Sequence, residues 1–205
     1  MSFPRSILEE ARNFVFDLFQ SASLQKYAYH NLSHTLSVVA AGKYLGRQHD
    51  LSLSDLEILE LAALFHDTGY LHHWQGHEEA SAEIACQFLR NQTYAEERIE
   101  QVIACILATK MPQRPGNLLE RIICDSDLFH LTQDTYLSKA FLLREEMEET
   151  RGRFLSDAMF LNSEVRFLSQ HQFKTAFVQK QFAHQKAKNI GLLHQLQQTY
   201  SLNVA

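Results

Sequence analysis

The chain has 205 residues, 45% of them hydrophobic and 21% charged, a composition that excludes a disordered or fibrous protein and is sufficient for a folded core. The formal net charge of −5 argues against a nucleic acid polymer as partner, because such binding relies on lysine and arginine neutralising phosphates. The sequence has no apolar stretch of about 18 residues and no apolar signal core near its start, so we expect a cytoplasmic protein with no membrane partner.

Helical periodicity dominates the sequence, and only 7 glycines and 3 prolines interrupt it. Helices are expected over residues 4–20, 32–48, 77–90, 95–110 and 117–131. Pro4 suits the first turn of the first of these helices. A further helix is expected to begin at Ser54, which forms a capping-box pattern with Glu57, and to run toward His66.

The last third of the chain is also expected to be helical, with one or two long amphipathic helices in residues 156–200. We interpret the acidic run at residues 145–149 as the solvated face of a helix. No segment has the alternating pattern of a strand. The sequence therefore predicts an all-α protein that forms a single domain over residues 1–205.

The three cysteines each lie in an apolar stretch, and none belongs to a Cys-x-x-Cys motif. This pattern predicts buried free thiols and argues against a disulfide framework or a zinc knuckle. The residues concerned are Cys86, Cys105 and Cys124.

Histidines and aspartates are the polar residues that do not fit a plain core. His66 and Asp67 end the apolar segment "LAALF", and burying both side chains is costly unless they find partners. His34 follows His30 by four residues, so both point to the same side of a helix. In "CDSDL", the apolar stripe extends to Asp127 rather than to Asp125. Two imidazoles and two carboxylates could bind a divalent ion and leave positions for water and substrate.

These motifs resemble the HD-domain superfamily of metal-dependent phosphohydrolases over about residues 28–131. The stretches that carry the resemblance are "YHNLSHTLSVV", "ALFHDTGY", "GHEEASAEIA", "TK" and "CDSDL". The first is similar to the Tyr-His-Asn-x-x-His stretch of cyclic-nucleotide phosphodiesterases. The resemblance implies an HD-domain helical core of five or more helices, followed by a C-terminal helical extension at about 132–205. It also implies one divalent ion (Mn, Mg, Co, Ni, Zn or Fe) held by the H…HD…D residues His34, His66, Asp67 and Asp127.

The resemblance further implies a phosphomonoesterase or phosphodiesterase that acts on a small phosphate ester, a nucleotide being one candidate. Asp67 would orient the attacking water, and His30 resembles the histidine that protonates the leaving oxygen, although it could instead be an ordinary histidine at a helix start. His77 and Lys110 are candidates for binding the substrate phosphate, but each also suits the helix end where it lies. Tyr29, Asn31 and Tyr70 are candidates for lining the pocket. His130, about one helical turn after Asp127, could contact a metal ligand or could be an ordinary histidine at the solvent edge.

Two other functions stay open at this point. A di-iron HD-type oxygenase would need further histidines; His77 could be one, but the helix at 95–110 has none, which disfavours a second metal. A non-catalytic HD ligand-binding or regulatory module is disfavoured because all four candidate ligands are present. The substrate, the metal, a homodimer and the role of the C-terminal helices are left undetermined.

Overall fold

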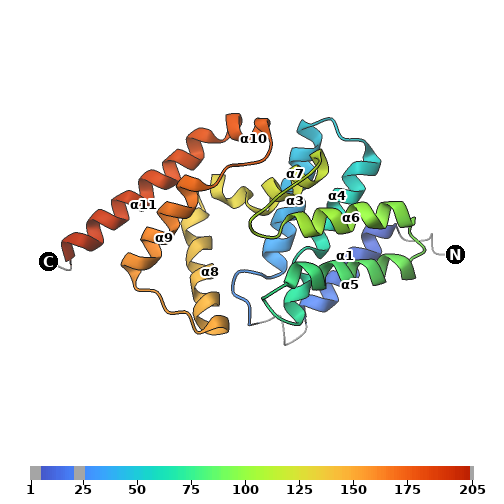
Figure 1. Ribbon diagram of the computed structural model, residues 1–205, viewed down its shortest axis with the longest axis horizontal. Helices are drawn as coiled ribbons and strands as arrows, with labels where there is room; N and C mark the ends of the chain where they lie inside the picture. Colours follow the sequence, from blue (N-terminus) through green and yellow to red (C-terminus); the bar gives the residue numbers. More distant parts are fainter. Residues whose placement is uncertain (1–5, 21–25, 204–205) are drawn as a thin grey trace. The chain divides into compact units, whose positions relative to one another are not determined.

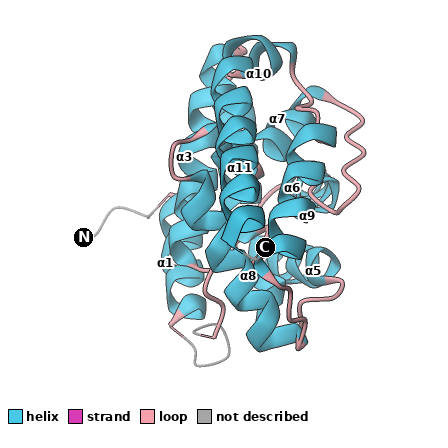
Figure 2. Cartoon of the chain, turned by 90° about the vertical axis from the view of Figure 1, so that its left-hand side faces the viewer, coloured by secondary structure: helices cyan, strands magenta, loops and turns pink. Residues whose placement is uncertain are grey.

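The computed structural model describes residues 6–20 and 26–203, and within these ranges the regular elements are all helices (Figure 2). The prediction of an all-α fold is confirmed. Contacts divide the chain into two compact units: Met1–Lys26 with His30–Asp127, and Tyr27–Tyr29 with Leu128–Ala205. That the whole chain forms a single domain stays a prediction.

The first unit is built around α4 (Leu53–Phe65), which Figure 1 labels. This helix is buried continuously from Ile58 to Phe65. A helix that is apolar on all sides must be surrounded by other helices. α4 packs against α1, α3, α5, α6 and α7, and α3 also packs against α7. The other elements of this unit are α1 (Ile7–Phe19), α3 (Leu32–Gln48), η1 (Thr68–Leu71), α5 (His77–Asn91), α6 (Glu96–Ala108) and α7 (Leu118–Asp127).

Two of the predicted boundaries in this unit are wrong. The side chain of Ser52, not that of Ser54, caps α4 by accepting the backbone N–H of Asp55, and Ser52 has the extended backbone that a cap requires. The helix predicted over 117–131 ends at Asp127, because the backbone of Leu128 leaves the α-helical region (φ −94°, ψ 14°). Pro4 lies outside the described residues.

The second unit holds the short 3₁₀ helix η2 (Phe129–Thr132) and four longer elements. The stretch 156–200 was expected to form one or two helices but contains three, since Thr175 caps a separate short helix before the last one begins. The elements are α8 (Tyr136–Arg151), α9 (Asp157–Gln170), α10 (Ala176–Gln181) and α11 (Ala183–Asn203).

The acidic run at 145–149 is not uniformly solvated, as the sequence had suggested. Glu145 and Glu149 are exposed, but Glu146 is completely buried and its carboxylate accepts the backbone N–H of Tyr29 at 2.9 Å. This bond supplies the partner that a buried carboxylate needs.

The cysteines are free, and their burial differs. Cys105 and Cys124 are buried, whereas Cys86 is half-buried. Across the described residues, no helix is both long and apolar enough to span a membrane.

Candidate metal centre

The N-terminus of α3 positions two of the candidate histidines. Asn31 caps this helix, since its side-chain oxygen accepts the backbone N–H groups of Ser33 and His34 at 2.9 and 3.2 Å. His34 therefore lies in the first turn, where it is buried, and His30 lies just before the cap. Asn31, a candidate for lining a pocket, thus has a structural role as the cap.

The C-terminus of α4 supplies the next two residues. His66 is the C-cap of the helix, and its ring Nδ1 lies 2.9 Å from the carbonyl oxygen of Ala63. When Nδ1–H donates to this carbonyl, Nε2 keeps its lone pair, which is the form of histidine that binds metals. Asp67 follows immediately, before η1 begins, and is 3% exposed.

Four side chains converge at this point from three segments of the first unit. His34 Nε2 lies 3.3 Å from His66 Nε2, 3.3 Å from Asp67 Oδ2 and 3.3 Å from Asp127 Oδ1. His66 Nε2 lies 3.1 Å from Asp67 Oδ2 and 3.6 Å from Asp127 Oδ1. Ligands bound about 2.1 Å from one ion lie about 3.0–3.5 Å apart, so the spacing fits a single divalent cation.

The polar atoms of this cluster also fit a cation. Asp67 Oδ2 is buried and has no hydrogen-bond partner among the described residues, and the Nε2 atoms of His34 and His66 lie 3.3 and 3.1 Å from it. The nearby Nε2 atoms of His34 and His66 face each other as well as the carboxylate. An ion between them would satisfy the carboxylate and both nitrogen lone pairs at once. The residues therefore fit a metal, and His34, His66 and Asp127 form the group that could hold it.

The pKa shifts have the same cause. Burial opposes the charged form of every member of the cluster. The neighbouring carboxylates outweigh burial at both histidines, so the pKa of His66 lies well above its usual value and the pKa of His34 is also raised. Burial likewise opposes charge on Asp67, yet the charge of His66 and the nearby imidazoles of His34 and His77 hold its pKa well below the usual range. The pKa of Asp127 is also lowered, because bonds from His34 and His66 outweigh burial. The cluster thus favours paired negative and positive charge.

The HD domain family matches this chain over residues 31–132, a range that contains all four converging side chains. The chain belongs to the HD-domain superfamily. The HD protein from an uncultured Thermotogales bacterium, described as a predicted HD superfamily hydrolase, is similar in structure. Its crystal structure aligns with a TM-score of 0.56 at 20% identity, covering 80% of this chain and 92% of that chain, a likeness of fold. None of the curated proteins compared matches the sequence. HD-family membership supports hydrolase chemistry at a general level.

Beside the HD pair, three aromatic rings form a cluster. Tyr70 is buried, and its ring stacks with that of His30 at 4.2 Å and lies tilted against that of His77, also at 4.2 Å. Its hydroxyl is hydrogen-bonded to His30 Nε2 at 3.1 Å. His77 Nδ1 lies 2.9 Å from the carbonyl oxygen of Trp74, and Nε2 lies 3.4 Å from Asp67 Oδ1.

The two candidate substrate-binding residues have different surroundings. Burial lowers the pKa of His77, but Asp67 and Glu78 outweigh it, so the net pKa is raised. His77 is thus joined to the HD aspartate. The side chain of Lys110 is half-exposed after the end of α6 and forms an ion pair with Glu79 of α5. The structure therefore brings His77 to the cluster, whereas the partner of Lys110 is a surface carboxylate.

Close packing around Gly69 was missed from the sequence. Gly69 donates its backbone N–H to Ser81 Oγ at 2.8 Å, and a Cβ at this position would lie 2.0 Å from the carbonyl oxygen of His77. The glycine after the HD pair thus allows η1 to touch the start of α5. A glycine two residues after the pair was the available signal; Ser81 offered none.

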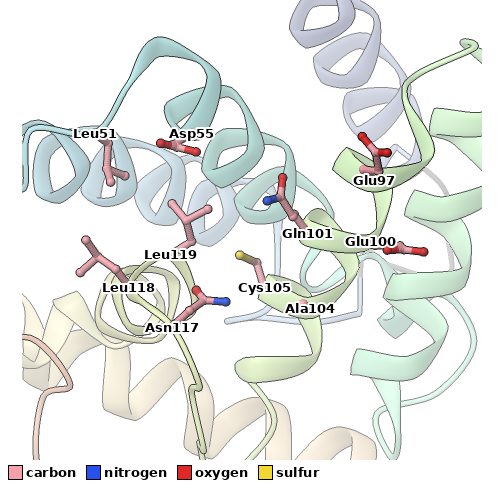
Figure 3. Close-up of a pocket in the computed structure, with 10 residues that line it drawn as sticks. All are labelled: Leu51, Asp55, Glu97, Glu100, Gln101, Ala104, Cys105, Asn117, Leu118 and Leu119. Atoms are coloured by element: carbon pink, nitrogen blue, oxygen red, sulfur yellow. The ribbon is translucent and has the colours of Figure 1, made fainter.

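A pocket elsewhere in the HD core is separate from this cluster. It has a volume of about 650 Å³ and lies beside α4, α6 and α7, with Asp55, Cys105 and Leu119 among its lining residues (Figure 3). None of the site residues predicted from the sequence lines it. Burial and the charge of Glu120 raise the pKa of the Cys105 thiol to about 12, which makes it an unreactive core cysteine.

Proposed function

We propose that this HD-domain protein is a metal-dependent phosphohydrolase that hydrolyses a small phosphate ester, a nucleotide being one candidate. The observation that carries the proposal is the convergence of His34, His66, Asp67 and Asp127 around a buried carboxylate oxygen that has no hydrogen-bond donor among the described residues. A divalent ion bound there would polarise a phosphoryl oxygen and lower the pKa of a coordinated water.

The protein's own groups divide the remaining work. Asp67 has one oxygen toward the ligand cluster and the other toward His77, so it can orient an attacking water. His30 gives a proton to the leaving oxygen, and its ring is kept in place by the stack and hydrogen bond with Tyr70. His77, at the start of α5, and Lys110, just after the end of α6, bind the substrate phosphate.

A di-iron oxygenase is the second candidate, and one distance favours it. His77 Nε2 lies 3.4 Å from the second oxygen of Asp67, so this carboxylate could bridge two ions. Against it, α6 has no histidine to complete a second set of ligands. Two irons per chain and oxygen consumption would support the oxygenase; one ion that is not iron would exclude it. A regulatory HD module is supported only if no phosphate ester is hydrolysed with any added metal.

The test is a panel of phosphate monoesters and diesters, including nucleotides, with Mn²⁺, Mg²⁺, Co²⁺ or Ni²⁺ added. His66→Ala and Asp67→Ala should abolish both metal binding and hydrolysis. His72→Ala is the matched control, because His72 is an exposed histidine six residues further along. Hydrolysis that survives in either of the first two variants would show that the proposed centre is not the catalytic one.

A further inference from the structure

The two points at which the chain crosses between its units lie close in the sequence to candidate metal ligands. Tyr29 is the last residue of a short segment that belongs to the second unit, and His30, four residues before His34, follows it. At the other crossing, Asp127 is the last residue of the first unit and Leu128 begins the second. Consecutive Cα atoms are about 3.8 Å apart, so movement of either crossing segment is passed directly to a candidate ligand helix.

Residues of the second unit join these two crossing segments to each other. The hydroxyl of Tyr29 is hydrogen-bonded to His130 Nδ1 at 3.2 Å, and the two rings meet edge to face. Tyr29 is buried, and its backbone N–H donates to the buried carboxylate of Glu146 on α8. Tyr29 thus fixes the segment before His30 to the segment that follows Asp127.

The segment after Asp127 is held from a second side. The buried side chain of Asn189 on α11 donates to the carbonyl oxygens of Leu131 and Gln133 at 2.9 and 3.0 Å. The position of η2 is therefore set by α11 as well as by Tyr29. α8 and α11 are among the C-terminal helices, for which the sequence indicated no role (Figure 1).

We propose that Tyr29 is a positioning residue of the metal centre: its bonds with His130 and Glu146 fix the N-terminus of α3, with His34, relative to the C-terminal end of α7, with Asp127. This inference rests on the proposed metal-dependent function. It gives the C-terminal unit a defined task, which is to maintain the short His34–Asp127 separation that one ion requires.

Tyr29→Phe removes the hydroxyl but keeps the buried ring. Tyr136→Phe is the matched control, because Tyr136 is also buried in the second unit and donates its hydroxyl to Glu164 at 2.6 Å. The substitution removes this hydroxyl and keeps the ring, which stacks with that of His130. Tyr29→Phe should weaken Mn²⁺ binding in calorimetry roughly 3- to 10-fold, the usual effect of one hydrogen bond. Tyr136→Phe should lower the unfolding temperature at least as much and leave Mn²⁺ affinity within about twofold.

A second measurement needs no metal. In metal-free protein, the imidazole NMR signals of His34 should shift or broaden in Tyr29→Phe and stay unchanged in Tyr136→Phe. Equal Mn²⁺ affinity in wild type and Tyr29→Phe, or equal loss in both variants, would overturn the positioning role. If the wild type binds no Mn²⁺, the proposed function fails, and the His34 signals still decide whether Tyr29 acts on that residue.

Discussion

Replacing Gly69 with alanine is expected to destabilise the HD core and displace His77 without touching any candidate metal ligand directly. The added methyl group would lie 2.0 Å from the carbonyl oxygen of His77 and 2.8 Å from the backbone nitrogen of Ser81. Both are backbone atoms of α5, so rotation of a side chain cannot relieve the overlap.

The size of the effect follows from these distances. Non-bonded carbon and oxygen atoms normally stay more than about 3 Å apart, so α5 has to move away by about 1 Å. Overpacking of this kind costs about 1–3 kcal/mol, and stretching the bond from Gly69 N–H to Ser81 Oγ adds about 1 kcal/mol. For a chain of this length, each kcal/mol lost from the free energy of unfolding lowers the Tm by about 2–4 °C. The Tm should therefore fall by about 5–15 °C.

The assay is thermal unfolding together with steady-state hydrolysis of the best phosphate ester. A shift of about 1 Å at His77 should lower kcat/KM by about 100-fold, because catalysis is sensitive to misplacement on this scale. Gly191→Ala is the control: Gly191 is an exposed residue within α11, and a Cβ there meets no atom within 4 Å. The free energy of unfolding of that variant should rise by about 0.5–1 kcal/mol, because alanine is favoured over glycine inside a helix. A Gly69→Ala protein as stable and active as wild type would refute the packing argument.

Three further predictions concern charge and protonation. In metal-free protein, protonated His34 and His66 stabilise the fold below about pH 6.5, and this stabilisation is lost as the pH rises through their raised pKa values. The ionised carboxylates of Asp67 and Asp127, whose pKa values are lowered, stabilise the fold above about pH 4. The Tm should therefore fall as the pH rises above about 6.5. Saturating Mn²⁺ should remove the fall, and an unchanged decline of the Tm with Mn²⁺ argues against the ligand set. His30→Gln should lower kcat about 10²- to 10⁴-fold while Mn²⁺ affinity stays constant, and wild-type kcat would exclude proton donation by His30. Lys110→Ala should raise KM with little change in kcat, and an unchanged KM would remove Lys110 from the substrate site.

The sequence predicted most of the fold and the composition of the cluster because both depend on local patterns. The pair His66–Asp67 ends an apolar segment, and the segment proves to be the buried end of α4. Helical periodicity through Leu119 and Ile123 pointed to Asp127, whose Oδ1 lies 3.3 Å from His34 Nε2. The roles of these side chains in metal binding and catalysis stay predictions.

The sequence did not predict two kinds of feature. One is a choice between neighbouring residues that fit the same local pattern equally well, and the other is a contact with a residue far away in the chain. Ser52 and Ser54 each precede an acidic residue by three positions, and local pattern cannot choose between them. Glu146 looked solvated because its partner, the backbone of Tyr29, lies 117 residues away in the chain. The Tyr29–His130 bond spans 101 residues and has no signal in either segment.

The most direct test of the central claim is hydrolysis measured against bound Mn²⁺ in the same sample. Metal-free protein is titrated with Mn²⁺, and both the bound ion and the rate of phosphate release are recorded at each step. If His34, His66, Asp67 and Asp127 form one catalytic metal centre, the rate rises in proportion to occupancy and reaches its maximum at one ion per chain. Hydrolysis at full rate before any ion is bound, or full occupancy without phosphate release from any ester tested, would contradict it.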